Sequence, residues 1–451
     1  MDTTLWSEIQ KFNLDNPNDQ YGFSTRLAFE NNWTLYFTKT AILEYKKFMY
    51  LAATYNEMVS PSEIVDIVWH QHLIFTNSYS EFCLLLSKRI EHIPSTHNRS
   101  EIEKFQKAKE KTKELYEINF GKQLDAIWGH INEFNALNLN ESYLKITLLK
   151  KIFLFLFILL ILPIYYIAKP ILIQIQNPDF LIYYVLLFAS LFALSEFLTK
   201  AIFNSIFNKI KSSILLNLSP FELIFLEKGK LEFVVHGVVN NLISNKKIEV
   251  LNNKRLNLID DNLTDNQYEN CIIEIMKEYE PIPYPQLYKI VIKKPLFEQL
   301  QKAVTRIKET IFNSKQFIII LITGMVVLGL ALSIGLSRIF SGVSRDKPIG
   351  YLLFLIIVLV LCSNFYLKRI KNYMFTYTIP LFFKKEKSNT EAEKDWEWNY
   401  FLYGKVILVS SFIPLTNYLN SSGIDSGNSW TSCGNSCGSS CGSSCGGCGG
   451  D

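Results

Sequence analysis

Four long apolar segments dominate the pattern of hydrophobic and polar positions along the chain. They cover residues 152–168, 180–198, 317–336 and 349–367, and only the second holds an acid, Glu196. A helix rises about 1.5 Å per residue, so each segment is long enough to cross roughly 30 Å of hydrocarbon. The pattern therefore predicts a multi-pass α-helical membrane protein with two transmembrane hairpins, at 146–199 and 317–367.

Residues 1–140, before the first hairpin, are typical of a soluble all-α domain, since apolar residues recur there at intervals of three or four. Ser60-Pro61-Ser62-Glu63 predicts a helix start, because Ser60 can cap, Pro61 suits the first turn and Glu63 follows the cap by three residues. We expect helices over 23–29, 38–55, 61–86 and 100–120, with Gly121 closing the last.

The predicted helix 61–86 has two unlike faces. At 100° per residue His72 lies in the middle of a broad apolar stripe, whereas Asp66 and His70 share the opposite side. The two histidines are about 200° apart and cannot chelate one ion from a regular helix. We therefore expect His72 in the core. The stripe consists of Val65, Val68, Trp69, His72, Phe75, Tyr79, Phe82 and Cys83.

Asp66 and His70, four residues apart, are the candidate chemistry of this helix. They could form a metal or acid–base pair, completed by His92 or His97 from the loop that follows. The alternative is an Asp–His hydrogen bond that docks the helix onto its neighbours. The segment is not H-E-x-x-H, so it does not indicate a metalloprotease.

The run from Pro61 to Leu73, PSEIVDIVWHQHL, is followed by Tyr79, Phe82-Cys83 and His92-Ile93-Pro94. This part of the chain, residues 20–130, resembles the glycine-rich domain-containing protein family, in which a P-S-x-x-V-D-x-x-W-H-x-H-L segment and a later H-x-P element recur. The resemblance implies no established chemistry. Plant relatives are linked to RNA binding and development, but through other domains. Further residues that fit the family are Glu44 to Phe48, Tyr116, Phe120-Gly121 and Trp128.

A second polar block, 200–316, separates the hairpins. Leu218-Ser219-Pro220-Phe221-Glu222 repeats the cap chemistry, and helix, helix, hairpin is the order of a winged-helix unit. The second helix has only Lys230 and His236 to meet phosphate, with Glu232 opposing, so we expect a protein partner and no nucleic acid. The predicted elements are helices 220–227 and 231–244, strands 248–251 and 255–259, and helices 265–279 and 295–312.

After the fourth span, residues 368–420 are predicted to form a charged and interfacial segment. Within it, 401–415 is apolar but short, and we expect it at the membrane interface or against the spans. Residues 421–451 form a Gly/Ser/Cys-rich tail that we expect to be disordered. The layout of 145–451 is similar to a bacterial membrane-protein family with a variable hydrophobic domain and, in some members, Gly/Cys repeats at the end.

Five of the eight cysteines lie in the last nineteen residues. Cys433, Cys437, Cys441, Cys445 and Cys448 follow C-x-x-x-C three times and then C-x-x-C. Thiolates at this spacing could bind Zn²⁺ or Cu(I). The alternatives are an unliganded low-complexity tail, since nothing between the cysteines can pack, or the precursor of a modified peptide.

Lysine and arginine near the span ends set the expected orientation. Twelve lie on the side of the polar blocks and four on the other side, which predicts cytoplasmic N- and C-termini in a cell membrane. The net charge of +4 alone does not indicate a nucleic-acid partner. The sequence thus predicts a mainly α membrane protein whose cytoplasmic domains bind a protein partner without catalysis. The alternative is a membrane-tethered metal-binding protein, or a metal-dependent enzyme, that uses Zn²⁺ at Asp66, His70 and His92 or at the tail thiols.

Overall fold

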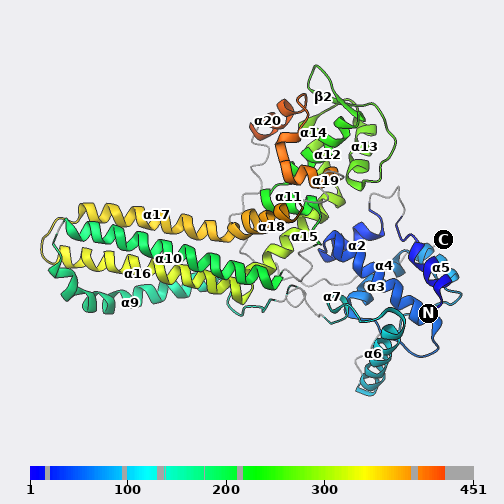
Figure 1. Ribbon diagram of the computed structural model, residues 1–451, viewed down its shortest axis with the longest axis horizontal. Helices are drawn as coiled ribbons and strands as arrows, with labels where there is room; N and C mark the ends of the chain where they lie inside the picture. The colour runs from blue at the N-terminus through cyan, green and yellow to red at the C-terminus, as the bar shows by residue number, and fades with distance from the viewer. Residues whose placement is uncertain are drawn as a thin grey trace, which may run out of the picture.

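The computed structural model describes residues 1–15, 21–93, 99–129, 137, 139–176, 178–210, 217–387 and 395–421. Over these residues the fold is mainly α, with one small antiparallel sheet of strand order β1-β2-β3. Figure 1 shows a long helical rod at one end and two compact lobes at the other. The N-terminal lobe contains α1–α7, and the second lobe contains α11–α15 and the helices that follow the rod.

The rod is built from four helices, each long and apolar enough to cross a membrane. The central helix, α16, packs against the other three, and 56% of its most apolar window is buried. No residue in the corresponding window of α9 is fully buried, so α9 packs against α16 on one side and leaves most of its apolar side chains exposed. The four helices are α9 (Ile146–Gln174), α10 (Asp179–Ile210), α16 (Lys315–Val343) and α17 (Gly350–Tyr373), and they confirm the four predicted apolar spans.

At the far end of the rod, Arg338 of α16 holds the end of α9. Its guanidinium donates to the backbone oxygens of Leu172 and Ile175 and lies over the ring of Phe180. The last carbonyl groups of a helix have no partner within the helix. The arginine therefore supplies a donor for backbone oxygens that α9 itself leaves without one.

Helix α3 (Leu35–Thr54) is the centre of the N-terminal lobe, and Tyr45, Phe48 and Met49 on it are fully buried. This helix confirms the one predicted over 38–55. Around it lie α1 (Thr3–Lys11), α2 (Phe23–Asn31), α4 (Glu63–Ile74), α5 (Thr76–Leu85), α6 (Arg99–Phe120) and α7 (Asp125–Trp128).

The prediction of one continuous helix over 61–86 is wrong in two respects. The first helix begins at Glu63 with Ser62 as its cap, and the backbone N–H of Ser60 donates to Thr112 Oγ1 at 2.8 Å. The helix also breaks at Phe75, whose φ of −85° and ψ of 64° are not helical. The break lets the Phe75 ring pack against Phe23, with 5.5 Å between ring centroids.

The second lobe begins with α11 (Pro220–Lys228), and its predicted capping box between Ser219 and Glu222 is present. The predicted hairpin is also present, with Ile248 opposite Leu258. The short β3 (Ile282–Pro283) and α14 (Tyr284–Val291) were not predicted. The other elements are α12 (Glu232–Ser244), β1 (Ile248–Val250), β2 (Arg255–Leu258), α13 (Gln267–Tyr279) and α15 (Pro295–Phe312).

The apolar segment 401–415 packs against the second lobe, and not against the spans, which was one of the two expected places. Phe412 is fully buried, with its ring centroid 5.0 Å from that of Tyr284 in α14. The backbone N–H of Val409 donates to Asn240 Oδ1 of α12 at 2.7 Å. The buried side chains of the segment, Phe401, Leu408, Phe412 and Leu415, thus join the core of the second lobe. After α17 the elements are a π-helix (Met374–Thr378), α18 (Ile379–Lys387), α19 (Trp396–Tyr403), a 3₁₀ turn (Gly404–Ile407) and α20 (Ile413–Ser421).

Candidate functional site

The structure brings Asp66, His70 and His92 together on the surface of the N-terminal lobe. One potential ligand atom from each lies within 4.8 Å of the others. His92 Nε2 is 3.0 Å from Asp66 Oδ1, and His70 Nδ1 is 3.3 Å from Asp66 Oδ2. Asp66 and His70 come from consecutive turns of α4, and His92 comes from the segment after α5. The predicted completion of the pair by His92 is therefore present as a spatial cluster.

The cluster is open to solvent on one side and packed on the other. The side chain of His70 is 55% exposed, whereas that of His92 is 18% exposed and its ring lies 4.6 Å from that of Trp69. Two imidazoles and a carboxylate are the donor types of three-ligand zinc sites, which leave one position for water. Without a metal, the same contacts tie the segment around His92 to α4. The alternative docking interpretation thus stays open.

The other predicted ligands cannot be compared with this geometry. His97 and the five tail cysteines, Cys433, Cys437, Cys441, Cys445 and Cys448, lie outside the described residues.

His72 is a core residue, as its place in the apolar stripe predicted. It is fully buried, and its ring nitrogens are bonded to Tyr45 Oη at 2.8 Å and Ser78 Oγ at 3.1 Å. Burial lowers the pKa of His72 from 6.5 to about 4, so the ring is neutral at pH 7. Both nitrogens are engaged, and His72 is therefore not available as a ligand.

Glu44 is a buried carboxylate whose partners come from three helices. It accepts hydrogen bonds from Tyr116 Oη and Trp128 Nε1 at 2.7 Å each, and from Lys47 Nζ at 2.8 Å. Glu44, Tyr116 and Trp128 were noted in the sequence only for their fit to a family pattern, and here they form one network. Fully paired buried charges of this kind hold a core together. A role in stabilising the core of the N-terminal lobe is therefore enough to account for Glu44, Tyr116 and Trp128.

His236, considered for phosphate contact, and Glu232, which was expected to oppose it, are both buried in α12. His236 and Glu232 are at most 1% exposed, and His236 Nδ1 is bonded to the hydroxyl of Tyr284. Most of α12 is enclosed by other helices of the second lobe. It therefore leaves little surface that could lie in a groove of DNA.

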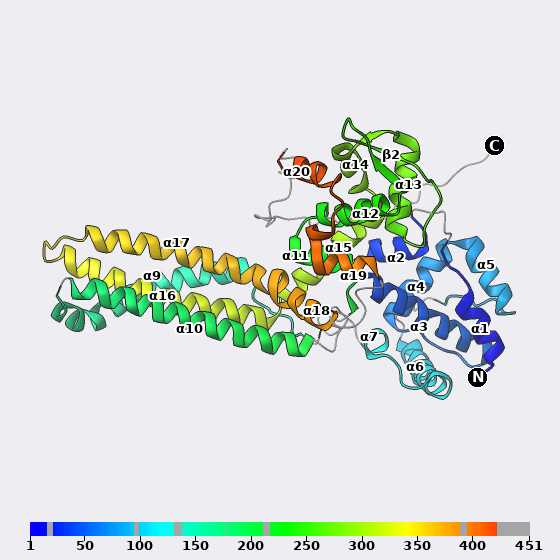
Figure 2. The same cartoon turned by 45° about the horizontal axis from the view of Figure 1, so that its top comes forward.

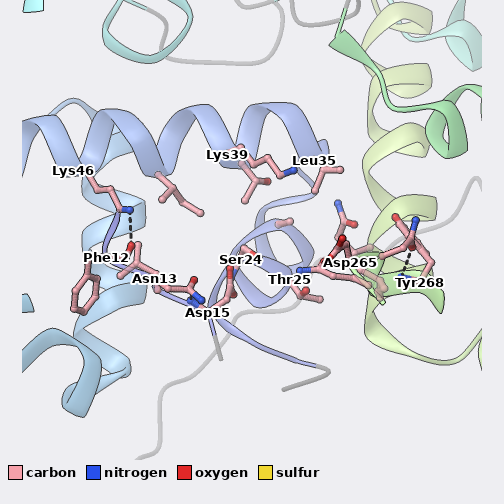
Figure 3. A pocket seen from close by; sticks show the side chains of 18 of the residues that line it. Phe12, Asn13, Asp15, Ser24, Thr25, Leu35, Lys39, Lys46, Asp265 and Tyr268 are labelled. Atoms are coloured by element: carbon pink, nitrogen blue, oxygen red, sulfur yellow. Dashed lines mark hydrogen bonds between the residues drawn. The ribbon is translucent and has the colours of Figure 1, made fainter. Parts of the chain in front are cut away.

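Sequence reasoning missed a pocket of about 470 Å³ between the two lobes. Figure 3 shows side chains of α3, including Lys39, across from Asp265 and Tyr268 of the second lobe. The walls come from segments more than 200 residues apart, so no local pattern could have indicated the pocket.

The chain matches no protein-family model, no curated protein and no solved structure.

Proposed function

We propose that this protein is a four-span membrane protein whose two lobes form a membrane-anchored protein-binding module without catalysis of its own. The observation that carries the proposal is the arrangement in Figure 2. The connections α9–α10 and α16–α17 lie at one end of the rod, and both lobes lie at the other. If the rod spans a bilayer, all the large folded surfaces face one compartment.

A cytoplasmic location of the lobes is part of this proposal and is supported by charge. Among the described side chains of the twelve cations counted on the side of the lobes, Lys308 is buried, at 9% exposure. On the other side, Arg338 is buried at 8% exposure and bonded to backbone oxygens. Without these two buried residues, lysine and arginine near the span ends are still more numerous on the side of the lobes than on the other side. This difference favours a cytoplasmic location of the lobes.

Two reporters on the full chain test the topology. One is fused after Asp451, and the other is inserted at Lys347 in the α16–α17 connection. We expect the first to report cytoplasm and the second the opposite compartment. A cytoplasmic signal at Lys347, or an external signal at Asp451, would contradict the four-span arrangement. In-cell crosslinking of the full chain, with and without residues 1–140, then tests whether a protein partner depends on the N-terminal lobe.

We further propose that the N-terminal lobe belongs to the glycine-rich domain-containing protein family and that residues 145–451 belong to the bacterial membrane-protein family described above. The first proposal is supported by the convergence of the family-pattern residues in one core, around Glu44 and His72. The order α11, α12, β1, β2 supports a winged-helix-like unit. Burial of α12 supports a protein partner over nucleic acid.

A second candidate function is metal binding at Asp66, His70 and His92, favoured by their 4.8 Å clustering. The purified full chain and a chain ending at Ser421 are both assayed for bound Zn²⁺ by elemental analysis and titration. We expect stoichiometric zinc in the shortened chain, lost in His92→Ala and in His70→Ala. His72→Asn is the control for a histidine outside the cluster. Zinc that is bound by the full chain but not by the shortened chain would be assigned to the five cysteines. If neither chain binds zinc, the metal site is refuted, and the contacts of Asp66 serve only to dock the segment around His92 onto α4.

A further inference from the structure

The pocket between the lobes has the size and position of a small-molecule site. Its volume is about 470 Å³, and its lining comes from the N-terminal lobe on one side and from α13, α15 and α19 on the other. Binding sites of roughly 300–1,000 Å³ occur preferentially at such domain interfaces. The lining is mixed, with apolar residues such as Leu35 and Leu296 beside charged ones.

Opposite charges lie on the two walls. Lys39 and Lys46 of α3 line the first wall, and Asp265 lines the second (Figure 3). Glu397 lines the second wall as well. Lys46 Nζ already donates to the backbone oxygens of Gln10 and Phe12 at 3.0 and 2.7 Å. The exposed Lys39 is therefore the cation that a ligand can reach.

The first wall also contains one carboxylate, Asp15. It accepts a hydrogen bond from the backbone N–H of Ser24 at 2.7 Å, and its charge favours the ammonium of Lys46. Asp15 thus belongs to the local support of this wall and largely offsets Lys46.

Glu397 is the most unusual group of the pocket. Its Oε1 accepts a hydrogen bond from Asn266 Nδ2, whereas Oε2 has no hydrogen-bond donor in the described part of the chain. Burial, and then the charge of Asp395, raise the pKa of Glu397 to about 7, while Lys39 lowers it. Glu397 is half-buried, and a carboxylate oxygen without a protein donor gains from a cation brought beside it.

We propose that the pocket binds a small zwitterion, an amino acid or a short peptide, with its ammonium at Glu397 and Asp265 and its carboxylate at Lys39. A ligand with two carboxylates would place one against the acidic wall, and a diamine would place one ammonium against Lys39. Because each wall belongs to a different lobe, a ligand that touches both also stabilises their docked arrangement. The proposal does not depend on the function proposed above.

Binding is tested on the full chain in detergent. Thermal unfolding is followed with each standard L-amino acid and with diglycine at millimolar concentration, and calorimetry then measures the affinity of any that stabilise. We expect at least one to raise the melting temperature and bind with one-to-one stoichiometry. Acetate and putrescine carry one kind of charge each and should not. The proposal is overturned if no amino acid or diglycine binds, or if putrescine or acetate binds as tightly.

Substitutions then locate the site. Glu397→Gln keeps an oxygen for Asn266 but removes the charge, and Lys39→Gln removes the opposite charge. Each should weaken the affinity about ten-fold or more. The matched controls are Glu110→Gln and Lys104→Gln, exposed residues of α6 outside the pocket, which should leave the affinity unchanged. Full affinity in both pocket variants would place the ligand elsewhere and overturn the assignment.

Discussion

The carboxylate of Glu222 in α11 accepts a hydrogen bond from the backbone N–H of Leu35, the first residue of α3, at 3.0 Å. Its other oxygen accepts from the backbone N–H and the hydroxyl of Ser219, at 2.7 and 2.9 Å. One buried side chain therefore caps two helices, one in each lobe, although Leu35 and Glu222 are 187 positions apart. The lobes are joined by a specific polar contact as well as by the packing of α2 on α15.

Loss of the Glu222 carboxylate should loosen the lobes. Glu222→Ala leaves two partly buried N–H groups and a hydroxyl without their acceptor, so we expect a loss of about 1–3 kcal/mol in the free energy of unfolding. Hydrogen exchange at the Leu35 amide should speed up together with it. The exposed Glu278→Ala in α13 is the control and should change neither quantity. A Leu35 amide that remains protected in Glu222→Ala would show that packing alone holds the lobes together.

The two histidines of α4 should differ sharply in their effect on stability. His72→Ala removes a fully buried ring and leaves Tyr45 Oη and Ser78 Oγ without this partner, and we expect a cost of about 2–4 kcal/mol. His70→Ala removes a side chain that is 55% exposed and should cost well under 1 kcal/mol. Thermal unfolding of the two variants in metal-free buffer compares them. Equal losses would contradict the assignment of the two faces of α4.

Glu397 should make stability depend on pH. Its pKa is raised from 4.5 to about 7 in the folded protein, so its protonated form is the one that folding favours. The contribution of Glu397 to stability is therefore complete below pH 4.5 and is lost as the pH rises through about 7. Glu397→Gln should remove this dependence. The free energy of unfolding of the variant minus that of the wild type should therefore rise by no more than about 3 kcal/mol between pH 4.5 and pH 8. Chemical unfolding across this pH range measures the difference, and parallel curves for the two proteins would refute it.

The contact between α12 and α19 should tolerate no side chain at Gly237. A Cβ atom there would lie 2.5 Å from two ring carbons of Tyr400, whose hydroxyl is held by the backbone oxygen of Phe233 at 2.8 Å. We expect Gly237→Ala to destabilise the second lobe by about 1–3 kcal/mol through overpacking. Adding Tyr400→Leu should recover part of that loss, because the ring that collides is gone. If the double variant is no more stable than the two single losses together predict, the collision is not the cause.

The sequence by itself determined the features that depend on neighbours along the chain. Unbroken apolar runs identify the four helices of the rod, because no other structure could bury such segments or satisfy their backbone in lipid. Ser219 and Glu222 predict the start of α11, because a capping box is formed within four consecutive residues. The placement of His72 inside and His70 outside follows from the helical period alone.

Only the tertiary structure decided which surfaces meet. The sequence shows that 401–415 is apolar and short, but its packing on the second lobe and not on the spans depends on the shape of the surface it covers, formed by α12 and α14. The break at Phe75 likewise depends on Phe23, which is distant in sequence. The contact between Glu222 and Leu35, the meeting of His92 with Asp66, and the pocket between the lobes join segments that share no local pattern. Such contacts are set by complementary shape and by the pairing of buried polar groups, and both exist only once the chain has folded.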